Sequence, residues 1–225
     1  MEIVLIRHGE PEWVRDGLNV DNPPLTERGV RQAEAMAEAL RDEYFDEVFC
    51  SPLVRTRQTA APLFAALGRP ETIEPWLEEI RNPIWHGTPR EKADRAYAED
   101  RARTAEDRWK GLEGGEPVGE FVARIHVGTT AFLAERSITR SGQQLAVWDG
   151  PVSEKRIAVV AHAGTNSVIV CHLLGLQPTP WEWERFVINH ASISRVESMT
   201  LADGITFCLT KLSDVEHLAS SDRTR

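Results

Sequence analysis

Three short, mainly hydrophobic runs stand out along the chain, at residues 3–6, 47–50 and 157–161. Runs of this length without polar alternation are typical of strands buried on both faces of a parallel sheet. Between the first two runs, hydrophobic residues recur at helical spacing over residues 26–44, with charged residues on the opposite face. Strands that alternate with helices predict an α/β domain.

Helix boundaries are marked by capping residues. Ser51-Pro52 predicts the start of a second helix, with Ser as N-cap and Pro at the first helical position, and Leu67-Gly68 predicts its end. A third helix is predicted over residues 165–174. The hydrophobic pattern also predicts a strand over residues 71–75.

The middle and the end of the chain carry further elements. Residues 89–112 are densely charged and alanine-rich, and a helical pattern follows over 117–137, so we expect a helical insertion at about 88–140. Two strands are predicted at 192–199 and 204–212, joined at Asp203-Gly204. We expect the polar tail, about 219–225, to be frayed.

Together these elements predict one domain over residues 1–225. No internal repeat or low-complexity linker divides the chain. The expected architecture is a three-layer αβα sandwich, in which a mostly parallel central sheet is flanked by helices.

Composition narrows the possible partners and the compartment. The 225 residues include 35 acidic and 26 basic side chains, a net charge of −9, which repels polyanions and argues against nucleic acid as a partner. The three cysteines lie far apart and suggest neither a disulfide framework nor a zinc site. No hydrophobic run reaches the ~20 residues of a membrane span and no signal-peptide pattern is visible, so we predict a cytoplasmic protein without a membrane partner. No cofactor or metal is predicted, and the oligomeric state is not indicated.

Polar residues follow three of the predicted strands. They are the segments Arg7-His8-Gly9-Glu10, Ser51-Pro52-Leu53-Val54-Arg55 and His162-Ala163-Gly164-Thr165. Ligands of open α/β sheets bind at the carboxyl ends of strands, so these segments are expected to converge. Together they would supply two guanidiniums, two imidazoles and two helix N-termini, which predicts an anion site. Phosphate is favoured because the planar guanidinium of arginine can donate two parallel hydrogen bonds to its oxygens.

These segments resemble the histidine phosphatase superfamily, which has the phosphoglycerate-mutase-like fold. The resemblance covers about residues 3–199 and rests on four ordered motifs. They are Arg7-His8-Gly9-Glu10; Pro24-Leu25-Thr26-Glu27-Arg28-Gly29 after Asp21; residues 51–60; and Val159-Val160-Ala161-His162. The resemblance implies that His8 is the nucleophile that becomes a phosphohistidine, and that Arg7, Arg55 and His162 hold the phosphoryl oxygens.

The same resemblance implies a proton donor. In this family a Glu after a Leu, ahead of Trp-x-Gly, has that role, and Glu79 fits it, with Glu78 as the nearest competitor. The chain departs from the family at Val14, where many members carry Asn; Asn19, Thr26 and Asn166 are the candidates to replace that phosphate contact. Ala163 stands where glycine commonly follows the second histidine, and we include it among the phosphate-binding residues.

Three functions remain open. The first is a metal-independent phosphatase that acts on a small phosphorylated metabolite. The second is a cofactor-dependent phosphoglycerate mutase, although the arginine-rich loop leading to consecutive prolines that a mutase would carry is missing. The third is a non-catalytic phosphate-binding protein. Both histidines and a carboxylate at the donor position argue against it, because pure binding needs only the cations.

Overall fold

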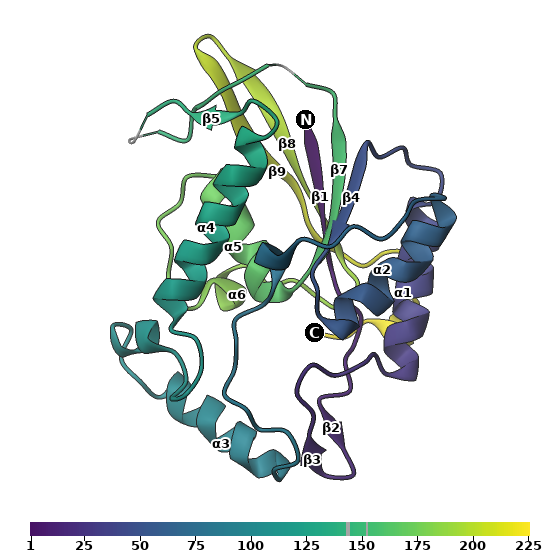
Figure 1. Cartoon of the computed structure of the whole chain (residues 1–225), viewed down its shortest axis with the longest axis vertical. Helices are drawn as coiled ribbons and strands as arrows, with labels where there is room; N and C mark the ends of the chain where they lie inside the picture. The colour runs from purple at the N-terminus through teal and green to yellow at the C-terminus, as the bar shows by residue number, and fades with distance from the viewer. Residues whose placement is uncertain (143–144, 152) are drawn as a thin grey trace.

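The computed structural model describes residues 1–142, 145–151 and 153–225. Within them a central sheet has the strand order β4-β7-β1-β8-β9-β6-β5. Its strands are β1 (Glu2–Arg7), β4 (Glu47–Cys50), β5 (Thr139–Arg140), β6 (Trp148–Asp149), β7 (Arg156–Ala161), β8 (Ile193–Leu201) and β9 (Gly204–Asp214). Figure 1 shows this sheet at the centre of the molecule.

One half of the sheet is parallel. β7 pairs in parallel with both β1 and β4. Val159 of β7 lies opposite Leu5 of β1 on one side and opposite Phe49 of β4 on the other. β8 is antiparallel to β1, and the remaining pairings, β8 with β9, β9 with β6 and β6 with β5, are antiparallel too. Because two reversals restore direction, β9 and β5 run the same way as β1, β4 and β7. The predicted α/β class with a mostly parallel sheet is confirmed.

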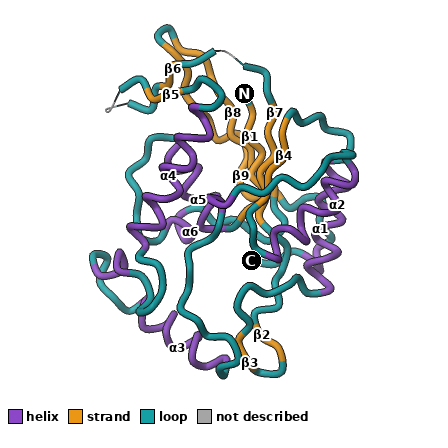
Figure 2. The backbone as a smooth tube through the Cα atoms, viewed as in Figure 1, coloured by secondary structure: helices purple, strands orange, loops and turns teal. Residues whose placement is uncertain are grey.

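Helices cover both faces of the sheet, as predicted. Figures 1 and 2 show α1 (Glu27–Leu40) and α2 (Val54–Ala66) on one side, and α4 (Val118–Ala134), α5 (Ala163–Leu173) and α6 (Glu182–Arg185) on the other. Thr26 caps α1, since its side chain accepts a hydrogen bond from the Gly29 N–H. The three-layer sandwich is therefore present. Among the described residues, no helix combines the length and the apolar character needed to cross a membrane.

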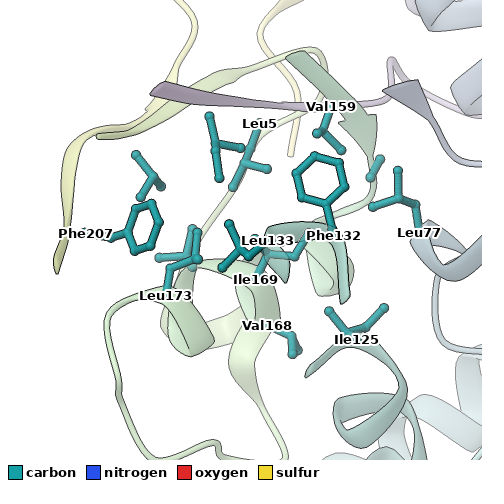
Figure 3. Close-up of a cluster of buried hydrophobic side chains, with 14 of the residues drawn as sticks. Leu5, Leu77, Ile125, Phe132, Leu133, Val159, Val168, Ile169, Leu173 and Phe207 are labelled. Atoms are coloured by element: carbon teal, nitrogen blue, oxygen red, sulfur yellow. The ribbon is translucent and has the colours of Figure 1, made fainter. Parts of the chain in front are cut away.

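The hydrophobic runs are continuous because both faces of the sheet are buried. In β1, Ile3 and Leu5 belong to the cluster under α4 and α5, whereas Val4 and Ile6 belong to the cluster under α1 and α2. Figure 3 shows the first cluster, where Leu5 and Val159 of the sheet face Phe132, Leu133 and Ile169 of the helices. Burial on both sides fixes where each strand ends, and hence where the residues that follow it lie.

Residues 88–140, predicted as a helical insertion, have two different surroundings. The helix α4 packs into the core through buried residues that include Phe121, Ile125 and Leu133. In contrast, α3 (Arg90–Arg101) lies beyond the end of the sheet, near the hairpin of β2 (Val14–Arg15) and β3 (Leu18–Asn19) (Figure 1). The short 3₁₀ helix η2 (Asp107–Lys110) connects the two.

Two local predictions need correction. Residues 71–75 form a single bridge, Ile73 to Cys50, before the 3₁₀ helix η1 (Pro75–Leu77), instead of a strand. The N-cap of α2 is Leu53 and not Ser51, whose hydroxyl contacts His162, the residue that follows β7. The end of α2 at Leu67-Gly68 is as predicted.

The tail, expected to fray, contains the 3₁₀ helix η3 (Ser220–Asp222) and is attached to α1. Arg31 forms an ion pair with Asp222, and Gln32 donates to the Asp222 carbonyl oxygen and the Thr224 hydroxyl. Leu218, at its start, is buried. Polar composition gave no sign of these contacts, because the partners lie about 190 residues away in the sequence.

Candidate active site

His8 lies directly after β1 and is 3% exposed. Its Nδ1 is 2.7 Å from the Gly9 carbonyl oxygen, which can only accept, so Nδ1 carries the proton. Its Nε2 accepts from Arg55 Nε at 3.3 Å. Burial, and then the charge of Arg55, hold the pKa of His8 well below its ordinary value. His8 is therefore a neutral imidazole with the lone pair on Nε2, the form required of a nucleophile.

Gly9 allows the turn that aims His8. A Cβ at Gly9 would lie 2.5 Å from the carbonyl oxygen of Gly29 in the first turn of α1, closer than any real contact. The Gly9 N–H also donates to Thr59 of α2. The chain after β1 is thus packed directly against both helices, and only glycine fits there.

Two arginines flank His8, the partly buried Arg7 and the buried Arg55. Arg7 donates from Nη1 to the Ile188 carbonyl oxygen and from Nη2 to His190 Nε2, while its Nε is buried without a partner among the described residues. Arg55, in the first turn of α2, is 4% exposed and lies with its guanidinium 4.8 Å from the centre of the Trp13 ring. Burial lowers the pKa of each to about 10, which leaves both charged at neutral pH. Neither forms an ion pair with a carboxylate in the described part of the chain, so their charge is available to an anion.

His162 is the N-cap residue of α5 and lies beside His8. The ring centroids are 5.1 Å apart, and His162 Nε2 is 2.7 Å from the Ser51 hydroxyl. Its Nδ1 is buried and has no partner among the described residues. Burial, then the charges of Arg55 and Arg7, lower the pKa of His162, which keeps it neutral. With the Ser51 hydroxyl as donor to Nε2, Nδ1–H is left to donate to a ligand.

Glu79 lies at the N-terminus of α5. Its carboxylate accepts from the Gly164 N–H at 2.9 Å and the Thr165 N–H at 3.1 Å, donors that helix N-termini offer to anions. A Cβ at Gly164 would lie 2.5 Å from Glu79 Oε1, so glycine is required for this approach. Glu78 points elsewhere and pairs with Arg81 at the surface. Of the two candidates, the geometry favours Glu79.

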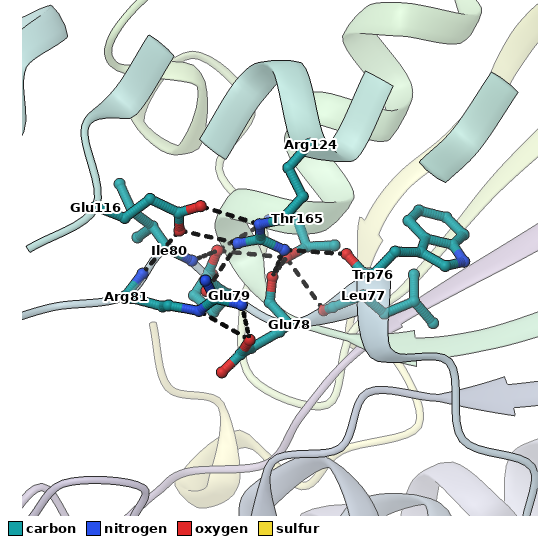
Figure 4. A network of polar contacts seen from close by, with 9 residues as sticks. All are labelled: Trp76, Leu77, Glu78, Glu79, Ile80, Arg81, Glu116, Arg124 and Thr165. Carbon is teal, nitrogen blue, oxygen red and sulfur yellow. Dashed lines mark hydrogen bonds and ion pairs between the residues drawn. The ribbon is translucent and has the colours of Figure 1, made fainter. Parts of the chain in front are cut away.

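Arg124 of α4 fixes the segment that carries Glu79. Figure 4 shows its guanidinium donating to the carbonyl oxygens of Trp76, Glu78 and Glu79, while Glu116 holds it from the other side. No spacing in the sequence indicated this residue, because it acts on backbone oxygens of a segment about 46 residues away.

The remaining predicted phosphate ligands have mixed positions. Ala163, the first residue of α5, lines the same cavity as His8. Asn19 donates to the Thr88 and Pro89 carbonyl oxygens and borders a neighbouring cavity. Thr26 uses its hydroxyl to cap α1 and to donate to Glu10, and this geometry does not support a phosphate contact. Asn166 lies buried inside α5 with its amide unpartnered among the described residues.

Two adjoining cavities meet at this site. The first, of about 350 Å³, is lined by Arg7, His8, Arg55, Glu79 and Ala163 together with residues of α3 and η2. The second, of about 980 Å³, shares Trp13, Arg55, Glu79 and Tyr97 with it. No cluster of three metal-ligating side chains occurs within residues 1–142, 145–151 and 153–225. The site therefore offers buried cations, backbone donors, a neutral imidazole and one carboxylate around a space of small-molecule size.

Several residues of the site were not predicted from the sequence. They are Trp13 over Arg55, Ser51 on His162, His190 on Arg7, and Arg225, which lines the first cavity. Only Ser51 lay within a recognised motif, where its position suggested a helix cap.

Comparison with known proteins identifies the family of this chain. Residues 3–200 match the histidine phosphatase superfamily (branch 1), and the chain belongs to that family. It is 30% identical over 197 residues to phosphoserine phosphatase 1 of Hydrogenobacter thermophilus, covering 86% of this chain and 85% of that protein. It is 28% identical to a probable phosphoglycerate mutase of Yersinia pestis, covering 97% and 95% of the two chains. Among solved structures, the α-ribazole phosphatase of Shigella flexneri superposes with a TM-score of 0.70 at 25% identity, covering 95% of this chain and 96% of that one.

Proposed function

We propose that this protein is a metal-independent phosphomonoester phosphatase that acts on a small phosphorylated metabolite through a phosphohistidine intermediate. The observation that carries the proposal is the His8 Nε2 lone pair, held on the wall of a small cavity between Arg7 and Arg55, neither of which pairs with a carboxylate in the described part of the chain. The arginines supply the positive charge that other phosphatases obtain from divalent ions.

In the first step His8 Nε2 attacks phosphorus as the bond from phosphorus to the leaving oxygen breaks. Arg7, Arg55 and His162 stabilise the charge on the equatorial oxygens, which is the main requirement of a loose transition state. Substrate binding displaces the 3.3 Å contact between Arg55 Nε and His8 Nε2 and turns that donor to the phosphoryl group. A carboxyl proton on Glu79 passes to the leaving oxygen.

In the second step the Glu79 carboxylate takes a proton from water, the water oxygen attacks phosphorus, and the bond from phosphorus to Nε2 breaks. For both steps Glu79 must leave the Gly164 and Thr165 N–H groups, which it occupies in this structure. Those two donors are then free for a phosphoryl oxygen.

The cavity and the relatives support a small substrate. The cavity that contains His8 has a volume of about 350 Å³, and the adjoining cavity, which shares Arg55 and Glu79, has about 980 Å³. Each volume is typical of a small-molecule site. The relatives' names include phosphatases of phosphoserine and α-ribazole phosphate and a probable phosphoglycerate mutase. A mutase would use the same histidine and arginines, and would differ by returning the phosphoryl group to an acceptor other than water.

The test is a panel of phosphomonoesters that includes p-nitrophenyl phosphate, phosphoserine and 3-phosphoglycerate, assayed with a chelator present. We expect release of inorganic phosphate that survives the chelator and is inhibited by vanadate. Activity that is lost on chelation and restored by a divalent ion would contradict the proposal. Isomerised phosphoglycerate without phosphate release would favour the mutase, and tight phosphate binding without turnover would favour a binding protein.

A further inference from the structure

The Arg7 guanidinium is oriented by two neutral acceptors. Nη1 donates to the Ile188 carbonyl oxygen at 2.6 Å, and Nη2 donates to His190 Nε2 at 2.9 Å. No carboxylate in the described part of the chain pairs with Arg7, and its buried Nε has no partner there. Neutral acceptors fix the direction of the guanidinium and leave its charge for an anion, whereas a carboxylate would neutralise it.

This contact determines the tautomer of His190. A guanidinium only donates hydrogen bonds, so His190 Nε2 must carry a lone pair and the proton must lie on Nδ1. His190 Nδ1 is 3.0 Å from the Thr224 hydroxyl, which therefore accepts. The Thr224 hydroxyl also accepts from Gln32 Nε2 at 2.8 Å, and its two lone pairs allow both bonds.

Thr224 is itself held in place. The His190 backbone N–H donates to the Thr224 carbonyl oxygen at 3.0 Å, and Gln32 of α1 donates to the Asp222 carbonyl oxygen at 2.6 Å. The His190 side chain is buried, and its pKa is lowered to about 3 by burial and then by the charge of Arg7. The ring thus stays neutral and able to accept over the range in which the enzyme would work.

We propose that His190 is a positioning residue for Arg7, and that the Thr224 hydroxyl stabilises the tautomer in which His190 can hold Arg7, by accepting the hydrogen bond from Nδ1–H. Without the Thr224 acceptor, the proton is free to move to Nε2, where it faces the Arg7 N–H. Arg7 then loses the contact that directs it toward the phosphoryl group. The activity readout below rests on the proposed phosphatase function, while the spectroscopic and binding readouts do not.

The first measurement is made on the unmodified protein. Long-range ¹H–¹⁵N NMR distinguishes a protonated from an unprotonated ring nitrogen, and the His190 signals are assigned by their loss in His190→Gln. We expect Nδ1 protonated and Nε2 unprotonated. A proton on Nε2 of His190 in the unmodified protein overturns the proposal.

The second measurement uses matched variants. Thr224→Val removes the hydroxyl at nearly constant shape, Thr224→Ser keeps it, and Thr210→Val removes an exposed hydroxyl from β9 as a control. We expect Thr224→Val to lower kcat/KM for p-nitrophenyl phosphate and to weaken vanadate inhibition, each by roughly 3–10-fold, the size of one neutral hydrogen bond. Thr224→Ser and Thr210→Val should remain within about twofold of the unmodified protein.

His190 itself gives the larger effect. His190→Leu, which has no acceptor, should lower both quantities by roughly 10–100-fold, as expected for a hydrogen bond to a charged group. His190→Gln, whose amide oxygen can accept from Arg7, should recover most of that loss. If Thr224→Val lowers the melting temperature but leaves kcat/KM and vanadate inhibition within twofold, the contact is only structural and the proposal is wrong.

Failure of the phosphatase function would be recognised separately. In that case the unmodified protein hydrolyses no phosphomonoester. The role of His190 can still be tested by its tautomer, determined by NMR, and by the affinity for inorganic phosphate, measured by calorimetry. We expect Thr224→Val to weaken phosphate binding with Thr224→Ser unchanged. Equal phosphate affinity in the three proteins would contradict the proposal.

Discussion

The two sides of the cavity differ in how they are held. We call Arg7, His8, Arg55 and His162 the floor. Arg7 ends β1, His8 follows it, and Arg55 lies in the first turn of α2; these three line the first cavity, and the buried His162 ring packs against His8. His8, Arg55 and His162 are at most 4% exposed. We call α3 and η2 the rim. Ala93 is the one buried residue of α3, and the ion pairs Arg90–Asp94 and Lys110–Asp107 lie at the surface.

This difference separates chemistry from specificity. The floor residues are fixed by the sheet, by helix starts and by buried hydrogen bonds, so their positions follow from the fold. Exposed ion pairs in proteins each contribute about 0–1 kcal/mol. The positions of Arg90–Asp94 and Lys110–Asp107 can therefore change at little cost in stability. The largely buried pair of Arg108 with Asp100 joins η2 to α3. The floor should therefore define the reaction, and the rim should select among substrates.

The largest effect is expected from removing the nucleophile. His8→Ala should lower the turnover of p-nitrophenyl phosphate by at least ~10⁴-fold, because it removes the nitrogen that carries the phosphoryl group in the proposed intermediate. Phosphate binding should persist, since Arg7 and Arg55 remain, and Trp13, which stacks on Arg55, provides a fluorescence signal for it. Turnover close to that of the unmodified protein would place the nucleophile elsewhere and end the distinction between floor and rim.

The floor could be predicted from the sequence for a topological reason. His8 and His162 directly follow strands β1 and β7, and Arg55 lies five residues after the end of β4. Parallel neighbouring strands bring their carboxyl ends to one edge of the sheet. Residues at those ends therefore lie close together, independently of the conformation of the loops.

Other contacts of the site leave no local sequence signal. His190 reaches Arg7 across 183 residues and Thr224 across 34, and neither lies in a motif. At Asn19 and Thr26 the residue type is visible in the sequence but the direction of the side chain is not, and both side chains bond to nearby backbone or side-chain groups. Polar residues near a motif are therefore weaker candidates than residues at strand ends.

The next effect concerns Glu79, which lies where floor and rim meet. Glu79→Gln should lower phosphorylation of His8 by an alkyl phosphate by roughly 10²–10⁴-fold, the usual range for positioned proton transfer. An aryl phosphate should react almost normally, because nitrophenolate leaves without a proton. The phosphoenzyme formed from the aryl phosphate should then accumulate, because the variant lacks the Glu79 carboxylate that would activate water. Rapid-quench analysis of acid-labile, base-stable labelled protein measures both.

Glu79→Gln should also tighten the binding of inorganic phosphate. The carboxylate occupies the Gly164 and Thr165 N–H groups, and a neutral amide is a weaker competitor for donors at a helix N-terminus. Glu78→Gln is the matched control, because Glu78 is the adjacent carboxylate and pairs with Arg81 away from these groups. If Glu79→Gln slows aryl and alkyl substrates equally and no phosphoenzyme accumulates, Glu79 only shapes the site, and the donor must be sought at Glu78.

A smaller effect concerns stability and pH. The pKa values of His8, His162 and His190 are lowered by burial in the folded protein, the last to about 3. Below their ordinary value of about 6.5, the unfolded chain binds protons that the folded protein does not, so stability falls as the pH is lowered toward the folded values. We expect a loss of roughly 1 kcal/mol per buried histidine for each pH unit below 6.5.

Urea denaturation at pH 7.5, 6.5 and 5.5 measures this loss. His190→Gln should have a shallower dependence than the unmodified protein, because one of the three buried imidazoles is gone. A free energy of unfolding that stays constant between pH 6.5 and 5.5 would show that the floor is hydrated and open, contrary to its burial. In such a result the floor, like the rim, would be accessible to solvent.

The smallest effect is expected at the rim. Arg101, exposed at the end of α3, lines the first cavity, whereas Arg95 on the same helix lines neither cavity. Arg101→Gln should raise KM for an anionic substrate by roughly 2–5-fold and leave kcat within twofold, because a rim charge changes encounter more than the transition state. The effect should shrink at high salt, where exposed charges are screened. Arg95→Gln, with the same change of net charge, should behave as the unmodified protein.

Steady-state kinetics at two salt concentrations tests this prediction. A fall in kcat of more than tenfold in Arg101→Gln would mean that the rim takes part in the chemistry. Equal effects of the two variants would mean that Arg101 acts only through the overall charge of the protein.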